Sequence, residues 1–449
     1  MSSTSALLEE KCNGVSLHEA LFYWLKLGFI SFGGPAGQIS MMHQELVEQR
    51  RWISEHRFLH ALNYTMVLPG PEAQQLATYI GWLLHGVKGG LIAGVLFVLP
   101  SLFILVALTW IYLLYGDTQT VTGVLYGVKP AVTAIVVLAA CRIGSRALKN
   151  NVLRAIALTA FIAIFIFQVS FPIIVISAGI LGYIGSRIGP EFFSANLHQV
   201  NEHESYGPAV IDDDTPVPTY AKFSWIRLIL FVIIGLTIWS GTMILLLLNF
   251  GWEDTLTQIG WFFSKAALVT FGGAYAVLPY VYQGGVDHYQ WLTATQMIDG
   301  LALGETTPGP LIMIVTFVGF VGGWTKEIFG AEMLSIAGIA GACVATFFTF
   351  LPSFLFIFIG GPVIEATRHD IQFTAPLLGI TAAVVGVILN LAVFFAYHVF
   401  WPQGFEGSID WFSILIGISA FFALYKYKIN IVKVLLACGF IGWLFLQIT

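Results

Sequence analysis

Charged residues are scarce in this chain of 449 residues. Asp, Glu, Lys and Arg make up 10% of it, hydrophobic residues make up 57%, and the mean hydropathy is +0.83. A soluble domain has about 25% charged residues, so most of this protein's surface must face lipid. A spanning helix needs about 20 apolar residues, so we expect an all-α integral membrane protein. Its expected partner is the lipid bilayer, and we expect it to bind no nucleic acid.

Cysteines and cofactor motifs are also few. Cys12, Cys141, Cys343 and Cys438 are scattered without C-x-x-C spacing, which argues against a disulfide framework or a thiolate metal site. The sequence has no glycine-rich dinucleotide fingerprint, no C-x-x-C-H, no His pair on one helix face and no G-x-S-x-G. We therefore expect no cofactor, no metal, no catalytic residue and no enzyme activity. The alternative of another class is a membrane-embedded reductase or hydrolase, which a cofactor spectrum would favour.

The N-terminus lacks the basic and then apolar pattern of a signal peptide, so insertion is expected to use the first spans. One long hydrophilic stretch, 189–223, separates an N-terminal repeat (1–188) from a C-terminal repeat (224–449) that begins with a linker helix. The stretch contains His198, Glu202, His203 and an acidic run at 212–214. Their spacing fits no helical metal motif, and we interpret the stretch as a solvated linker.

Apolar segments bounded by polar or Gly/Pro residues predict about 13 hydrophobic helices. We expect the first and eighth to be candidates for dipping into the bilayer and returning. The segments lie near 17–39, 58–85, 89–115, 121–147, 152–169, 171–188, 224–250, 256–281, 296–322, 331–361, 374–400, 408–425 and 429–448.

The distribution of basic residues favours a cytoplasmic N-terminus in the cytoplasmic (inner) membrane. With that orientation the inside loops hold twelve cations between Lys88 and Lys433. The outside would hold Lys326 together with Arg50, Arg51 and Arg57, and this basic loop counts against the assignment.

An internal repeat is the most informative feature. The stretch SFGGPAGQISMMHQELVEQRRW at 31–52 aligns with TFGGAYAVLPYVYQGGVDHYQW at 270–291, and the offset of 239 continues to a Pro-Gly-Pro motif in each half. VLPS at 98–101 matches FLPS at 350–353 with an offset of 252. The repeats begin at the first and eighth segments, and this odd separation predicts opposite orientations, which is the inverted-repeat plan of secondary transporters.

Each Pro-Gly-Pro motif is expected to break a spanning helix. The motifs are Pro69-Gly70-Pro71 and Pro308-Gly309-Pro310. Proline removes a backbone donor and disfavours helix in the preceding residue, and broken backbone at membrane depth is tolerated only inside protein or along a wet cavity. With Pro71 and Pro310 as first residues of the second half-helices, two positive helix N-termini would form an anion site. An ordinary kink is the alternative.

Three lysines lie within apolar segments. Lys26 and Lys265 obey the offset of 239, and each precedes its Phe-Gly-Gly by six residues. An intramembrane lysine is a functional candidate by default, and this pair predicts two ammonium groups that converge on one anion. Lys129 has Ala375 as its counterpart, which would make the site asymmetric. Snorkelling to the interface is the alternative for all three.

Further candidates surround these motifs. Phe32-Gly33-Gly34 and Phe271-Gly272-Gly273 allow close backbone approach to a ligand, although close helix packing is an equal alternative. Glu305 and, less favourably, Glu72 are proton-coupling candidates, because Glu72 also suits a helix N-terminus. The hydroxyl groups of Thr306 and Thr307 would bind oxyanion oxygens.

The motifs FGGPAGQI, VLPGPEAQQLATYIGW, FGGAYAVLPYV and ETTPGPL, with GVKPAV between them, resemble the chromate ion transporter family over nearly the whole chain. The resemblance implies gradient-driven export of chromate, resistance to chromate, and sulfate as an analogue. It is compatible with a homodimer. The first half has Pro35 after its Phe-Gly-Gly motif where the second has Ala274. A transporter of sulfate or another tetrahedral oxyanion is the nearest alternative.

Overall fold

A computed structural model of the chain describes residues 14–32, 34–189, 206–213, 215, 218, 220–271, 273–366, 374–404 and 406–448. These residues form helices, with one isolated β-bridge between Ile53 and Ile211. Seven of the helices in this described part are long and apolar enough to cross a membrane. The all-α membrane architecture expected from composition is therefore confirmed.

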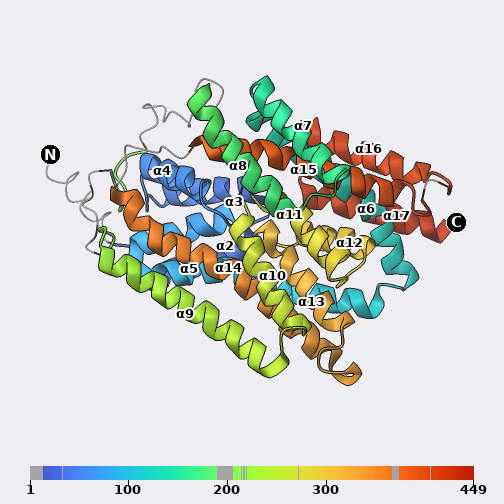
Figure 1. Cartoon of the computed structure of the whole chain (residues 1–449), viewed down its shortest axis with the longest axis horizontal. Coiled ribbons are helices and arrows are strands. Elements are labelled where there is room, and N and C mark those ends of the chain that lie inside the picture. Colours follow the sequence, from blue (N-terminus) through green and yellow to red (C-terminus); the bar gives the residue numbers. More distant parts are fainter. Residues whose placement is uncertain are drawn as a thin grey trace.

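In chain order the helices fall into two matching series, and the helix that links them, α9 (Trp225–Phe250), lies along one edge of the molecule (Figure 1). The first series is α2 (Leu17–Ile30), α3 (Gly34–Met42), η1 (His43–Gln49), α4 (Glu55–Thr65), α5 (Glu72–Tyr115), α6 (Gln119–Ala147), α7 (Asn151–Phe165) and α8 (Phe171–Ile188). Then α9 leads to α10 (Thr255–Val269), α11 (Ala274–Tyr282), η3 (Gln283–His288), α12 (Ala294–Thr306), η4 (Leu311–Met313), α13 (Ile314–Thr325), η5 (Ala331–Met333), α14 (Leu334–Ala366), α15 (Thr374–Phe400), α16 (Trp411–Tyr425) and α17 (Ile431–Ile448). Even the lengths agree, since α7 and α16 have 15 residues and α8 and α17 have 18.

The first predicted segment is a hairpin. Arg50, just beyond η1, binds Glu19 in the first turn of α2 at 3.2 Å, and the rings of Tyr23 and Trp52 are 5.1 Å apart. Both ends of the α2–α3–η1 segment therefore lie together, with its tip at 31–34. In the second series the rings of Phe262 and Trp291, 239 residues later, are 5.6 Å apart.

A second hairpin follows, made of α4 and the first part of α5. Helix α5 is interrupted at His85 (φ −136°) and Gly86 (φ +61°). The His85 ring lies 2.7 Å from the Val15 carbonyl oxygen, and the Leu83 carbonyl accepts from the Tyr220 hydroxyl at 2.7 Å. Since Ile53, before α4, pairs with Ile211, both hairpins open at one end of the molecule, which we call the proximal end.

The second series has the same pair of hairpins at the other end, the distal end. A Cβ on Gly322, near the end of α13, would lie 3.1 Å from Trp291 and 3.5 Å from Ile259. The start of α10, the end of its hairpin and the end of α13 therefore meet. The Trp110 indole also donates to the Ser335 hydroxyl at 2.9 Å, which brings the end of α5 to the start of α14 there.

The remaining helices pack mainly on helices of the other series. Helix α6 packs on α16 and α17, and α15 packs on α7 and α8. A Cβ on Gly127 would lie 1.9 Å from the Cys438 carbonyl oxygen, and one on Gly182 would lie 2.6 Å from that of Ala375. Glycine at these positions allows the backbones to approach as membrane helices require.

The chain crosses between the two ends five times from the start of α2 to the start of α10, through the second part of α5, α6, α7, α8 and α9. This odd number gives the two series opposite orientations. It replaces the count of seven separate spans, because the first two segments return to their own side. Consequently Arg50, Arg51 and Arg57 lie at the proximal end with the start of α2, and not across from it.

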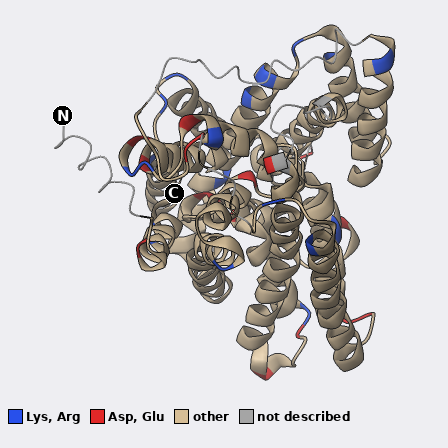
Figure 2. Ribbon diagram, turned by 90° about the vertical axis from the view of Figure 1, so that its left-hand side faces the viewer, with Lys and Arg blue, Asp and Glu red and all other residues tan. Residues whose placement is uncertain are grey.

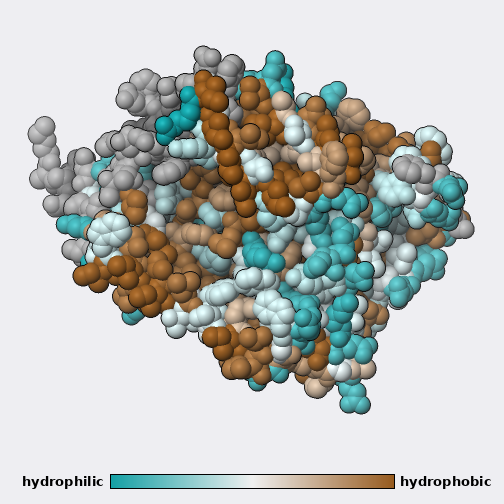
Figure 3. Space-filling view, viewed as in Figure 1, coloured by the Kyte–Doolittle hydropathy of each residue, from teal (hydrophilic) through white to brown (hydrophobic). Residues whose placement is uncertain are grey.

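Large parts of the outer surface are apolar. Only 11% of the most apolar 18-residue stretch of helix α9 is buried. Brown apolar side chains lie along the edge where α9 runs and along the path of α8 (Figure 3). Charged residues are few and lie mostly near helix ends and connections (Figure 2). This is the pattern expected of helices that face lipid tails.

The hairpin topology predicts a labelling pattern. In a variant without the four native cysteines, His18→Cys and Glu48→Cys should react with a membrane-impermeant maleimide from the same side. Lys326→Cys should react from the opposite side. Labelling of intact cells and everted vesicles measures this, and reaction of positions 18 and 48 from opposite sides would show that α2 and α3 together span the membrane.

Candidate functional site

The two Pro-Gly-Pro loops meet the Phe-Gly-Gly tips of the opposite series. The Gly70 N–H donates to the Thr270 carbonyl at 2.8 Å, and the Gly309 N–H donates to the Ser31 carbonyl at 2.9 Å. The donors differ by 239 residues and so do the acceptors. The two Pro-Gly-Pro loops and the two Phe-Gly-Gly tips are the four hairpin tips. These reciprocal bonds join them around a local two-fold axis.

The glycines of these loops are required by geometry. Gly70 has φ +129° and Gly309 has φ +101°, values that L side chains rarely adopt. A Cβ on Gly70 would lie 2.6 Å from the Ser353 hydroxyl oxygen, and one on Gly309 would lie 2.7 Å from the Ser101 Cβ. Each loop thus lies against the Leu-Pro-Ser stretch of the opposite series.

The loops separate helices as predicted, but their second prolines have a different position. Pro71 (ψ 105°) and Pro310 (ψ 134°) are extended N-cap residues, and the helices begin at Glu72 and Leu311. The prediction that these prolines are the first helical residues is therefore wrong by one residue. An N-cap has non-helical ψ because its carbonyl only begins the hydrogen-bond ladder. The N-terminus of α5 still points into the tip region.

The Phe-Gly-Gly tips are partly described. Phe32 and Phe271 are half-buried, and Gly34 (φ +71°) and Gly273 (φ +93°) have left-handed backbone. Gly33 and Gly272 lie outside the described residues. A Cβ on Gly273 would lie 3.8 Å from a carboxylate oxygen of Glu72, so this candidate proton carrier is beside the tip of the second series. The linker histidines His198 and His203 are likewise outside the described part.

The second candidate proton carrier is hydrogen-bonded. Glu305 is 6% exposed and accepts from the Tyr275 hydroxyl at 2.5 Å. Thr306 and Thr307, expected to bind oxyanion oxygens, donate to the carbonyls of Leu303 and Gly304 at 2.9 Å each. Their hydroxyl protons are thus engaged by their own helix, and an oxyanion would have to compete for them.

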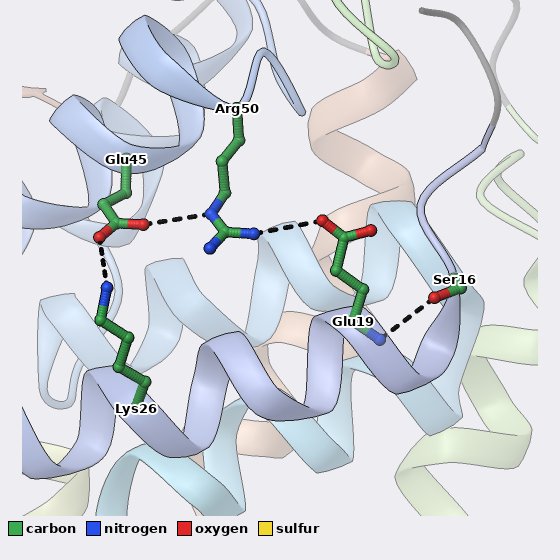
Figure 4. A network of polar contacts seen from close by, with 5 residues as sticks. All are labelled: Ser16, Glu19, Lys26, Glu45 and Arg50. Carbon is green, nitrogen blue, oxygen red and sulfur yellow. Dashed lines mark hydrogen bonds and ion pairs between the residues drawn. The ribbon is translucent and has the colours of Figure 1, made fainter.

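Lys26 has a carboxylate partner. Its Nζ lies 2.9 Å from Glu45 Oε1, and Arg50 joins Glu45 (3.1 Å) to Glu19 (3.2 Å). Figure 4 shows this network between α2 and the returning arm of its hairpin. The Lys26 side chain is 54% exposed. It lines a cavity of about 220 Å³ with Tyr23 and Glu45, and the carboxylate makes this cavity a poor anion site.

Lys265 has a different neighbour. Its Nζ lies 5.5 Å from the centroid of the Trp261 ring, within the range of a cation–π contact. The structure thus gives one lysine a carboxylate and the other an indole. Convergence of both ammonium groups on one anion stays a prediction.

Lys129 forms an ion pair that the sequence did not reveal. Its Nζ lies 3.5 Å from Asp299 Oδ1, and the Tyr112 hydroxyl donates to Asp299 Oδ2 at 3.0 Å. Asp299 is 2% exposed. The ion pair joins α6 to α12, and the Tyr112 hydrogen bond joins α5 to α12, so both contacts cross between the two series. An aspartate within the apolar segment 296–322 was the signal available, since intramembrane carboxylates are uncommon and functional.

Comparison with known proteins places both series in one family. The profile of the chromate transporter family matches residues 18–183 and 257–443, which include the four tips. The chain belongs to this family. A chromate transport protein of Pseudomonas aeruginosa is 33% identical over 447 residues, covering 98% of this chain and 95% of its own.

Two further relatives have lower identity. A chromate transport protein of Cupriavidus metallidurans is 30% identical, covering 85% of this chain and 83% of its own. An uncharacterized transporter of Methanocaldococcus jannaschii is 26% identical, covering 97% and 96%. No solved structure matches. Membership in this chromate transporter family, together with the apolar helices, identifies a multi-pass membrane transporter.

The tip glycines give a direct prediction. Gly70→Ala and Gly309→Ala should each lower stability by about 1–3 kcal/mol through backbone strain, and more through the contacts with Ser353 and Ser101. The apparent unfolding temperature of the purified protein measures this. Gly241→Ala on α9, whose Cβ would meet nothing within 4 Å, is the control and should unfold as wild type does. Equal stability of all variants would contradict the tip geometry.

The buried ion pair gives a second prediction. Lys129→Met leaves Asp299 unpaired and should destabilise the protein by roughly 3 kcal/mol, whereas Lys129→Met/Asp299→Asn should recover most of it. Thermal unfolding measures stability, and transport is measured on the same proteins. A stable double variant that transports normally would exclude Lys129 from substrate binding, and a double variant as unstable as the single one would contradict the pairing.

Proposed function

We propose that this protein exports chromate from the cytoplasm across the inner membrane, driven by the membrane electrochemical gradient, and thereby confers chromate resistance. The observation that carries the proposal is the reciprocal meeting of the two Pro-Gly-Pro loops with the opposite Phe-Gly-Gly tips. In inverted-repeat transporters, substrates bind where broken helices of the two repeats meet. The names of the relatives in Pseudomonas and Cupriavidus supply the substrate.

The chemistry of the tips suits a dianion. The N-terminus of α5 carries about half a positive charge from its unpaired N–H groups. At Gly70 and Gly309 the absence of a side chain lets the backbone of each loop lie close to its neighbours. The proposed substrate-binding groups are the two Pro-Gly-Pro loops, Phe32, Phe271 and the adjacent glycines, with Thr306 and Thr307. Glu305 and Glu72 beside them are available for proton coupling.

Lys26 and Lys265 are proposed to supply positive field and not direct contact. Each lies five residues before its tip residue, Ser31 or Thr270, which is about 7.5 Å along a helix. The partners described above hold their ammonium groups on the arms of the hairpins. Since Glu45 balances the charge of Lys26, most of this field comes from Lys265 beside the Trp261 ring, and a charge at this distance attracts an anion where the surroundings are apolar.

The proposed orientation rests on the positions of the cations. Arg50, Arg51 and Arg57 lie at the proximal end, where they no longer oppose the other basic residues, and Lys326 lies at the distal end. Further cations lie near the proximal ends of helices, at Lys88, Arg142, Arg146, Lys149, Arg154, Arg187, Lys222 and Arg227. The positive-inside rule therefore supports a cytoplasmic proximal end and a cytoplasmic N-terminus.

Export of a dianion is favoured by the membrane potential. Each elementary charge that leaves a negative interior gains about 2.3 kcal/mol per 100 mV, so chromate gains roughly twice that. Since about 1.4 kcal/mol corresponds to a tenfold concentration ratio, a potential of about 100 mV could sustain an outside-to-inside chromate ratio of about 10³ without a coupling ion.

Flux into everted vesicles tests the proposal. Vesicles with wild-type protein and an interior-positive potential should accumulate radiolabelled chromate, and a protonophore with a permeant anion should abolish it. Vesicles without the protein are the control. Accumulation of sulfate but not chromate would favour the other oxyanion, and transport of neither would contradict the proposal.

The lysines are tested in the same assay. Lys26→Ala/Lys265→Ala should reduce chromate flux at low salt by several-fold, with a smaller difference at high salt, because screening weakens a field more than a direct contact. Complete loss at every salt concentration, with normal protein abundance, would show instead that the ammonium groups bind the anion directly.

A further inference from the structure

Two buried serines beside the Pro-Gly-Pro loops have no hydrogen-bond partner. The Oγ atoms of Ser101 and Ser353 have none within the described part of the chain, and both residues are 0% exposed. They are equivalent, because they differ by the offset of 252 that relates VLPS to FLPS. A buried hydroxyl without a partner is unfavourable by about 1–3 kcal/mol, so two equivalent ones need a physical reason.

Other buried hydroxyls on the same two helices are satisfied. Thr109 on α5 donates to the Leu105 carbonyl at 2.6 Å, and Thr349 on α14 donates to that of Ala345 at 2.7 Å. This bond to the residue four positions earlier is the usual solution for Ser and Thr in membrane helices. Ser101 and Ser353 each follow a proline, at Pro100 and Pro352, and do not use it.

The position of the two hydroxyls links them to the tips. The Ser353 Oγ would lie 2.6 Å from a Cβ on Gly70, and the Ser101 Oγ would lie 3.1 Å from a Cβ on Gly309. Each serine therefore stands beside the loop of the opposite series. Buried oxygens of Gln74 and Gln75, just after the first loop, also lack partners, so unsatisfied polar groups gather in this part of the interior.

We propose that Ser101 and Ser353 are substrate-binding residues whose hydroxyl groups donate hydrogen bonds to two oxygens of a tetrahedral dianion held between the Pro-Gly-Pro loops. This deepens the proposed function and rests on it. Neutral donors suit a transporter, because hydrogen bonds to an anion compensate its desolvation without the permanent charge that would retain it. One serine from each series gives the anion equivalent partners on both sides of the two-fold axis.

The test is direct binding of radiolabelled chromate to purified, detergent-solubilised protein. Ser101→Ala and Ser353→Ala should each weaken binding by about tenfold, the lower range for a hydrogen bond to a charged group, and the double variant by roughly a hundredfold if the effects add. Thr109→Val and Thr349→Val remove buried hydroxyls from the same helices and should bind as wild type does.

The outcomes separate this inference from the proposed function. If wild-type protein binds chromate and the double serine variant binds equally well, the serine assignment is overturned while the function stands. An equal loss in the threonine variants would also overturn it, because the effect would then be structural. If wild-type protein binds no chromate, the proposed function fails first. Should the double variant not be produced, the single variants decide by the same criterion.

Discussion

Inside a bilayer, every backbone polar group must find a partner within the protein, and the tip structure depends on this constraint. Four chain reversals lie in the interior, and each reversal exposes N–H and carbonyl groups that a continuous helix would have satisfied. The amides of Gly70 and Gly309 are satisfied by carbonyls at the ends of α10 and α2. Because neither series satisfies these amides with its own carbonyl groups, the two series must fold against each other.

The acidic groups do not follow the symmetry of the backbone. At the offset of 239, Glu72 corresponds to Leu311, Glu305 to Met66 and Asp299 to His60. The tips and serines are thus paired, while each carboxylate belongs to one series. A two-fold backbone with one-sided charges can present the same ligand geometry to both sides and still distinguish them, as directional transport requires.

Much of this architecture could be predicted because it depends on local chemistry. Apolar segments set the helices, and Pro-Gly-Pro set the breaks by removing donors and allowing positive φ. The return of the first segment, through α2 and α3, was among the expected candidates. The return of the second segment, through α4 and the first part of α5, was not, because the interruption at His85 and Gly86 depends on contacts with residues far away in the chain. The N-cap position of Pro71 was missed by one residue for a similar reason, since it depends on the path of the loop.

The chemistry of the site was harder to predict than the fold. The lysines were predicted to bind substrate because an unpaired charge in lipid is unfavourable. Their long flexible side chains, however, reach partners such as Glu45 that the sequence does not indicate. Asp299 is paired by residues 170 and 187 positions away in the chain. Ser101 and Ser353 end the matched VLPS and FLPS stretches, but only their burial without a partner among the described residues distinguishes them from Thr109 and Thr349.

The central claim is that the dianion binds where the four tips meet. Chromium provides its own label, so anomalous diffraction from crystals grown with chromate locates the anion without assumptions about the protein. We predict one strong chromium peak between the Pro-Gly-Pro loops, within hydrogen-bond distance of the hydroxyls of Ser101 and Ser353. A peak beside Lys26 or Lys265, with none at the tips, would contradict the account.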